Sequence, residues 1–181
     1  ELEIPFNKIT DISPLSDLIS LQKLDLSSNR IREAGPLARL TSLKYLDIGQ
    51  NEIINLGPLA NLTSLEHLDI SGNEAGRSYA IWHAGQPPPP RKIGLPRITD
   101  LGPLSKLKNL KILLAHWNHI NDLRPLATLP LEVLRIEDNK IDDLSPLADM
   151  KSLKQLQIEN NEIVDLSVLI ELKERYGILE M

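Results

Sequence analysis

The chain of 181 residues contains no cysteine. This absence excludes disulfide bonds, thiolate metal sites and a cysteine nucleophile, and it leaves the cellular compartment undetermined. No apolar run approaches the roughly 18 residues that a membrane-spanning helix needs. The formal net charge is −5, whereas a nucleic-acid surface needs a basic face. We therefore expect neither membrane insertion by this chain nor nucleic-acid binding.

Aromatic residues are also scarce, at 3% of a chain that is 41% hydrophobic. The core must therefore be aliphatic, built mostly from leucine and isoleucine. Side chains of this size suit many small and similar slots better than one large central cluster. This composition indicates a repeated architecture, so internal periodicity is the next property to test.

Asparagine recurs at intervals of 22 residues at the start of the chain and at 21 and 22 near its end, giving Asn7, Asn29, Asn51, Asn73, then Asn118, Asn139 and Asn161. The gap from Asn73 to Asn118 is 45 residues, which we interpret as two repeats plus one residue. Pro96 then stands in the asparagine position, because Ile98, Leu101 and Pro103 follow it in the usual register. The period predicts a single domain, 1–181, of about eight repeats.

One unit, residues 43–65, illustrates the local structure that the pattern predicts. Leu46 and Ile48 alternate with outward residues, as in a short strand. Asn51 lies where the chain turns away from the strand, and its amide can bond to backbone groups of neighbouring units. The Gly-Pro-Leu step at 57–59 suits the start of a 3-10 turn, with Gly or Ser expected to act as the cap. Stacked units form an α/β solenoid, with a curved parallel sheet on the concave face and short helical turns on the convex face.

Residues 74–95 depart from the pattern and include Tyr79, Trp82 and four prolines, Pro87–Pro90. Consecutive prolines favour an extended path and cannot form a regular helix. The segment is either a decayed repeat or a functional loop that presents these aromatic residues and prolines. We also expect Pro96 to remove one rung of the asparagine ladder, because it has no side-chain amide and no N–H.

The chain ends differ from each other. Residues 166–177 predict an amphipathic helix that ends at Gly177 and covers the last repeat. Leu2 and Ile4 begin directly in a strand with no comparable cap, so we expect the native protein to continue upstream of Glu1.

The repeat resembles a known family. The phrase Asn7-Lys-Ile-Thr-Asp-Ile-Ser-Pro-Leu15, and the segment from Leu107 through Leu110 to Asn118, are similar to the 22-residue leucine-rich repeats of bacterial internalins and of SDS22-type phosphatase regulators. The resemblance covers residues 1–73 and 96–172. It implies a protein-binding concave face, and it offers no catalytic residue to transfer, so we expect no enzymatic activity.

Two types of function are compatible with this resemblance. The first is an internalin-like recognition or adhesion module at a bacterial cell surface or in a secreted protein. The second is a cytoplasmic scaffold, either of the phosphatase-regulator type or as the repeat region of a Roco-type GTPase. The flanking sequence would distinguish them, since a signal peptide and surface anchor favour the first and a downstream GTPase domain favours the second.

The repeat register identifies the outward strand positions. Asp25, Asp47 and Asp69 should form an acidic stripe about 10 Å long, because parallel strands lie about 4.8 Å apart. A basic partner segment would relieve their repulsion, although the stripe could instead serve solubility or bond to neighbouring side chains. Farther along, the face becomes apolar and mixed, which is typical of a contact surface. The predicted partner-binding residues are Tyr45, Asp47, His67, Asp69, Lys92, Leu114, His116, Trp117 and Arg135.

Trp117 is the best candidate for a residue that dominates binding energy. The alternative is that it packs over the neighbouring segment 82–95. His116 and His119 have the spacing of a possible metal pair, but one lies on the strand and the other beyond the turn, so we expect no metal site. No cofactor is expected, and the chain should be a monomer.

Overall fold

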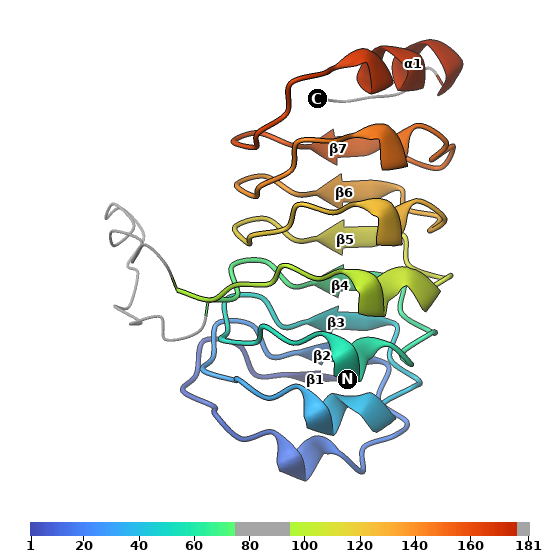
Figure 1. The fold of residues 1–181 in the computed structure, drawn as a ribbon. Coiled ribbons are helices and arrows are strands. Elements are labelled where there is room, and N and C mark those ends of the chain that lie inside the picture. The colour runs from blue at the N-terminus through green and yellow to red at the C-terminus, as the bar shows by residue number, and fades with distance from the viewer. Residues whose placement is uncertain (75–94, 177–181) are drawn as a thin grey trace.

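The computed structural model describes residues 1–74 and 95–176. Within them, one seven-stranded sheet has its strands in chain order and all parallel (Figure 1). Each strand is two or three residues long and lies directly beside the equivalent strand of the next repeat. The strands are β1 (Leu2–Glu3), β2 (Lys23–Asp25), β3 (Tyr45–Asp47), β4 (His67–Asp69), β5 (Ile112–Leu114), β6 (Val133–Arg135) and β7 (Gln155–Gln157).

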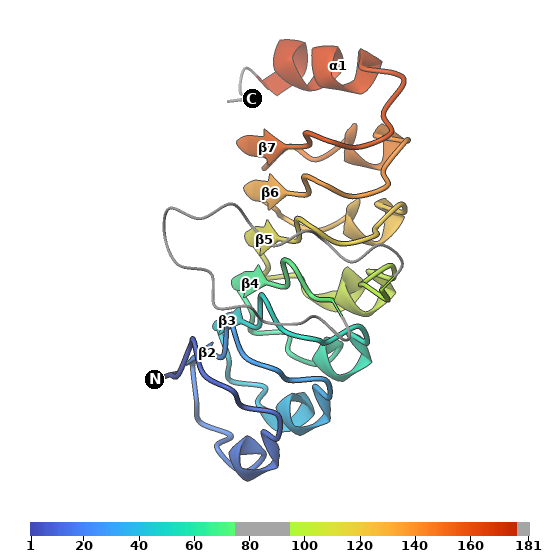
Figure 2. The same ribbon diagram turned by 90° about the vertical axis from the view of Figure 1, so that its left-hand side faces the viewer.

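Short 3-10 turns lie on the side of the solenoid opposite the strands (Figure 2). The predicted solenoid, with its sheet on the concave side and 3-10 turns on the convex side, is confirmed. Adjacent turns also contact one another, so the stack is continuous on both sides. The turns are η1 (Ser13–Leu15), η2 (Gly35–Arg39), η3 (Gly57–Leu59), η4 (Gly102–Lys106), η5 (Arg124–Leu126) and η6 (Ser145–Leu147).

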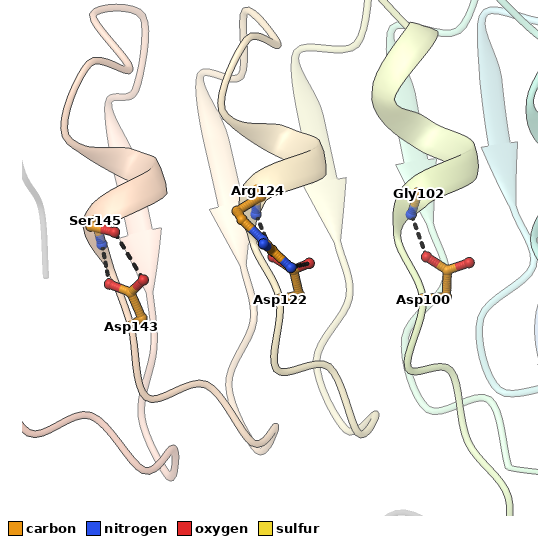
Figure 3. A network of polar contacts seen from close by, with 6 residues as sticks. All are labelled: Asp100, Gly102, Asp122, Arg124, Asp143 and Ser145. Carbon is orange, nitrogen blue, oxygen red and sulfur yellow. Dashed lines mark hydrogen bonds and ion pairs between the residues drawn. The ribbon is translucent and has the colours of Figure 1, made fainter.

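The helical turns are capped differently from the sequence expectation. Proline occupies the first or second position of each turn, as predicted, but no residue at the N-cap position makes a side-chain capping bond. Instead, in five of the six described turns, all except η2, an Asp or Asn two residues before the first residue of the turn accepts its backbone N–H. Figure 3 shows three such pairs in successive repeats, at N···O distances of 2.7–2.9 Å: Asp100 with Gly102, Asp122 with Arg124, and Asp143 with Ser145.

The core fills the space between strands and turns with stacked aliphatic side chains. In the central repeats the inward residues Leu46 and Leu68 of the strands, Ile48 directly after β3 and turn residues such as Leu59 are fully buried. In the first repeat Leu2, Ile4 and Ile9 are only partly buried. The core is thus a column of equivalent slots, in which each repeat covers its neighbours.

The asparagines form the predicted ladder. Each interior Asn side chain donates through Nδ2 to a carbonyl of its own repeat and to one of the preceding repeat; for Asn51 these are Ile48 and Leu26, at 3.2 and 3.0 Å. Its Oδ1 accepts the backbone N–H of Ile31 at 3.0 Å. Because buried backbone groups must find partners, the ladder fixes the spacing between repeats.

Among the described residues, no strand lies between β4 and β5. Strand β4 pairs directly with β5, with His67 opposite Ile112 and Asp69 opposite Leu114. The ladder also passes straight across, because Asn118 Nδ2 donates to the carbonyl of Ile70 at 3.1 Å. The expectation of an extra strand between these positions is therefore wrong. Ile98 and the η4 turn complete the repeat that begins with β4 and Asn73.

A polar neck joins the two points where the chain leaves and rejoins this repeat. Glu74 and Arg97 form an isolated antiparallel bridge, and their side chains form an ion pair of 2.7 Å, with 8% and 10% of each exposed. Residues 75–94, which include most of the irregular segment discussed above, lie outside the described residues.

The ladder of asparagine donors is continuous at this place, contrary to the expectation for Pro96. Within the described part of the chain, what is missing is the hydrogen bond that the next asparagine, Asn118, would accept. In other repeats the Asn Oδ1 receives a backbone N–H from the repeat before it, as Asn139 does from Ile120 at 2.9 Å. The Oδ1 of Asn118 is buried and has no hydrogen-bond partner among the described residues. The insertion thus leaves the donor side of the ladder complete and interrupts its acceptor side.

Helix α1 (Ser167–Tyr176) follows the last strand. Leu169 and Leu172 face the last repeat and are buried, while Ile170 on the same helix is exposed. The Asp165 carboxylate accepts the backbone N–H of Ser167 at 2.8 Å, which repeats the capping pattern of the turns. Gly177, the expected end of the helix, lies outside the described residues.

Candidate interaction surface

The concave face presents two rows of outward strand side chains. The strand register places the members of each row side by side. The first row runs Lys23, Tyr45, His67, Ile112, Val133 and Gln155; the second runs Asp25, Asp47, Asp69, Leu114, Arg135 and Gln157. Both rows change character between β4 and β5, where polar and ionisable residues give way to the apolar Ile112, Val133 and Leu114; Gln155, Arg135 and Gln157 then end the rows.

The acidic stripe consists of Asp25, Asp47 and Asp69, aligned as the repeat period predicts. The carboxylates of Asp25 and Asp69 each accept both the N–H and the hydroxyl of the serine two residues later. Asp47 has Gly49 at that position and accepts only the backbone N–H, at 2.9 Å. Hydrogen bonds from neighbouring serine side chains thus help to satisfy Asp25 and Asp69. Asp47 accepts the fewest hydrogen bonds of the three.

Gly49 leaves space where two of these carboxylates approach each other. A Cβ atom at this position would lie 3.0 Å from Asp69 Oδ1 and 3.2 Å from Asp47 Oδ1. Burial, followed by the nearby charge of Asp69, raises the pKa of Asp47 to about 7. A basic group from outside the chain would favour the ionised form of this carboxyl and offset its poor solvation.

An aromatic stack lies beside the acidic stripe. The rings of Tyr45 and His67 are stacked with centroids 4.4 Å apart and planes 22° apart, and the Lys23 ammonium lies 5.4 Å from the centre of the tyrosine ring. Burial lowers the pKa of His67 and raises the pKa of Tyr45. Both rings are therefore favoured in their neutral forms and present a flat surface next to the carboxylates.

The apolar part of the face begins at β5. Ile112, Leu114 and Val133 are partly exposed on neighbouring strands, and Arg135 lies exposed beside Leu114. Because β4 pairs with β5, the acidic stripe adjoins Leu114 directly. Lys92, which was expected to flank this patch, lies outside the described residues.

Trp117 stands at the turn that follows β5. Its backbone is in the left-handed region, with φ of 59°, and the residue is 38% exposed. The indole Nε1–H donates to Asp138 Oδ2 of the next repeat at 2.8 Å, and the His116 ring packs edge-on at 4.8 Å between centroids. Trp117 is therefore held in place while part of its ring remains open to solvent. The segment 82–95, the alternative contact for this ring, lies almost wholly outside the described residues.

A shallow cavity of about 320 Å³ opens beside Trp117. It lies at the ends of β5, β6 and β7 and is lined by His116, Trp117, Arg135, Glu137, Asp138, Gln157, Glu159 and Asn160. The sequence prediction included three of these residues and omitted the two glutamates. Their signal was present, because Glu137 and Glu159 occupy the same outward column as His116 in the next two repeats.

The described residues hold no cluster of three or more His, Cys, Asp or Glu side chains arranged to bind a metal ion. His116 and His119 in particular do not converge with further ligands there. Within the same ranges, 1–74 and 95–176, none of the helices has the length and apolar character that crossing a membrane requires.

The comparisons with known proteins agree with this architecture. Models of the leucine-rich repeat match residues 19–74, and models of two copies of the repeat match residues 131–171. Internalin C2 of Listeria monocytogenes superposes with a TM-score of 0.79 at 30% identity, over 94% of this chain and 66% of that protein. No curated protein sequence matches the chain.

Two further structures are similar. An internalin (InlF) of Listeria monocytogenes has a TM-score of 0.74 at 27% identity, over 96% of this chain and 52% of its own. The leucine-rich repeat ectodomain of a plant receptor kinase from Arabidopsis thaliana, solved in complex with Casparian strip integrity factor 2, shares the fold at 22% identity and a TM-score of 0.67, over 90% of this chain and 18% of its own.

The chain belongs to the leucine-rich repeat family, and its repeats are of the internalin type. Leucine-rich repeat domains are protein-interaction modules, and the rows described above form the concave face of one. The chain spans 66% of internalin C2 and 52% of the second internalin.

Proposed function

We propose that this domain recognises a protein partner through its concave face, as an internalin-like recognition or adhesion module. The observation that carries the proposal is Trp117, a partly exposed tryptophan held by Asp138 and placed beside the apolar residues of β5 and β6. Fixed aromatic side chains supply large contact areas at a small entropic cost, and they dominate many protein interfaces.

The two halves of the face fit different parts of a partner. The acidic stripe and the Tyr45–His67 stack suit a basic segment, and the patch of Leu114 and Trp117 suits an apolar one. The proposed contact residues within the described part of the chain are Tyr45, Asp47, His67, Asp69, Leu114, His116, Trp117 and Arg135. We propose that the domain acts as a monomeric, non-enzymatic binding module.

An affinity capture tests this proposal. Wild type and Trp117→Ala are immobilised in parallel and exposed to the same extract or set of purified ectodomains. Arg124→Ala is the control, because Arg124 is exposed in a convex turn. We expect proteins retained by wild type and by Arg124→Ala to be lost from Trp117→Ala. Equal retention by all three baits would contradict binding through this face.

A further inference from the structure

Two of the side chains that line the cavity beside Trp117 carry polar atoms without hydrogen-bond partners. Glu137 Oε2 and His116 Nδ1 are both buried, and neither finds a hydrogen-bond partner among the described residues. Buried polar atoms without partners are costly and uncommon in native structures. A bound group that donates hydrogen bonds here would remove that cost.

The charges around the cavity favour a cation. Its lining includes the carboxylates of Glu137, Asp138 and Glu159 against the single guanidinium of Arg135. Asp138 is already the acceptor of the Trp117 indole, so it fixes the ring as well as adding negative charge. An apolar side chain placed here would desolvate these carboxylates without pairing them.

The side chains that line the cavity favour a guanidinium over an ammonium group. Trp117 provides an aromatic wall, and tryptophan is the side chain with the strongest cation–π attraction. A guanidinium is planar, stacks on aromatic rings and donates hydrogen bonds from several N–H groups, whereas an ammonium is a compact, strongly hydrated point charge. Glu137, next to this wall, can accept a charge-assisted hydrogen bond from such a group.

We propose that the cavity lined by Trp117, Glu137 and Glu159 is a subsite for an arginine side chain of the protein partner. The subsite deepens the proposed function and rests on it. The guanidinium stacks on the exposed part of the indole and donates to the Glu137 carboxylate. Arg135, exposed at the rim, limits how many positive charges the cavity accepts and so favours a single arginine over a basic run.

A small-molecule titration tests the subsite without knowledge of the partner. The probe is N-acetyl-L-arginine N-methylamide, and the readout is the NMR signal of the Trp117 indole N–H, assigned by comparison with Trp117→Phe. The norleucine and lysine analogues serve as probes of similar length. We expect saturable shifts with arginine, at least fivefold weaker binding of norleucine, and weaker binding of lysine.

Two variants complete the test. Glu137→Gln keeps the size of the side chain and should weaken arginine binding about fivefold, because it replaces a charge-assisted hydrogen bond with a neutral one. Asp17→Asn, at an exposed side chain that pairs with Arg39 away from the concave face, should leave it unchanged. Circular dichroism establishes that both variants are folded. Equal shifts with arginine and norleucine, equal affinities for arginine and lysine, or full binding by Glu137→Gln would each overturn the subsite.

The outcome is separable from that of the proposed function. A partner that loses affinity for Trp117→Ala and binds Glu137→Gln as tightly as wild type would contradict the arginine subsite and support the concave face. Arginine binding in the cavity, with partner capture unaffected by Trp117→Ala, would support the subsite as a cation site and contradict the proposed function.

Discussion

At the residue scale, the buried asparagines determine how one repeat joins the next. Asn51 and Asn118 are both almost completely buried and occupy equivalent positions. Asn51 uses both ends of its amide, whereas the Oδ1 of Asn118 has no partner among the described residues. The two residues therefore form a matched pair for measuring what the acceptor bond contributes to stability.

We expect Asn51→Ala to lower the free energy of unfolding by about 3 kcal/mol, because several buried backbone groups lose their partners. Asn118→Ala should cost about 1 kcal/mol less, since the wild-type residue already lacks one bond. Urea unfolding of both variants beside wild type measures the difference. A larger loss for Asn118→Ala would contradict the interrupted ladder.

Asp47 gives a pH-dependent prediction. Its folded-state pKa of about 7 lies above the ordinary value of 3.8, so the folded protein binds this proton more tightly than the unfolded chain does. The cost of the carboxylate is absent below the ordinary pKa and fully present above the raised one, and stability falls as pH rises between them. We expect Asp47→Asn to stabilise the fold by about 1–2 kcal/mol at pH 8, allowing for solvent screening, and by much less at pH 5.

Denaturant unfolding of wild type and Asp47→Asn at the two pH values checks this expectation, and Asp17→Asn serves as a control on an exposed acidic side chain. A variant less stable than wild type at pH 8 would show that the carboxylate is well accommodated after all.

Sequence reasoning located the acidic stripe and Trp117, because equal spacing in the chain becomes adjacency in the sheet. It did not predict the Trp117–Asp138 bond or the raised pKa of Asp47. Both depend on side-chain conformation and burial, which the register alone does not determine.

At the element scale, five of the six described 3-10 turns, all except η2, depend on a carboxylate or amide two residues before them. Asp143 accepts both the N–H and the hydroxyl of Ser145 at 2.8 Å (Figure 3). The sequence pattern predicts the capping role for the residue just before the proline. The acidic column was visible in the sequence, but a Ser or Gly at the helix start is also a common cap, and only the backbone geometry separates the two.

Replacing this cap should destabilise the last repeats. We expect Asp143→Ala to lower the free energy of unfolding by about 1 kcal/mol. Asp142→Ala is the matched control, because Asp142 is exposed and has no hydrogen bond within the described residues. Thermal unfolding distinguishes the variants, and equal midpoints for the two would contradict the capping role.

The irregular segment shows why the register failed at one place. A gap of 45 residues between Asn73 and Asn118 equals two periods and one residue, but it also equals one period and an insertion of 23. Ile98 and Leu104 fit both interpretations, since the same turn follows in each. Only the pairing of β4 with β5 decides between them.

At the scale of the whole molecule, the solenoid is continuous across the insertion. The neck of Glu74 and Arg97 brings the two ends together, and the sheet and ladder bypass the segment. Closing the gap with a short linker should therefore preserve the stack.

We expect replacement of residues 76–95 by a four-residue Gly-Ser linker to change the free energy of unfolding by less than about 1 kcal/mol, because loop-closure entropy depends weakly on length. Urea unfolding and far-UV circular dichroism measure the effect. Loss of cooperative unfolding would show that the segment is part of the stack.

The proposed function depends on several repeats together, because no single repeat carries both the acidic stripe and the apolar patch. Asp47 lies on β3, and Trp117 follows β5, so a partner that uses both must span the middle of the concave face. This division could be predicted from the outward columns of the sequence. The direct contact between the acidic and apolar halves could not be predicted, because it depends on the pairing of β4 with β5.

The most direct test is the affinity of a captured and purified partner for the double variant Trp117→Ala/Asp47→Lys, measured by calorimetry beside wild type and the convex-face variant Arg124→Ala. We expect the concave-face variant to bind at least about tenfold more weakly, since it removes an aromatic anchor and reverses a charge. Arg124→Ala should bind like wild type. Unchanged affinity of the double variant would contradict the assignment of the concave face as the binding surface.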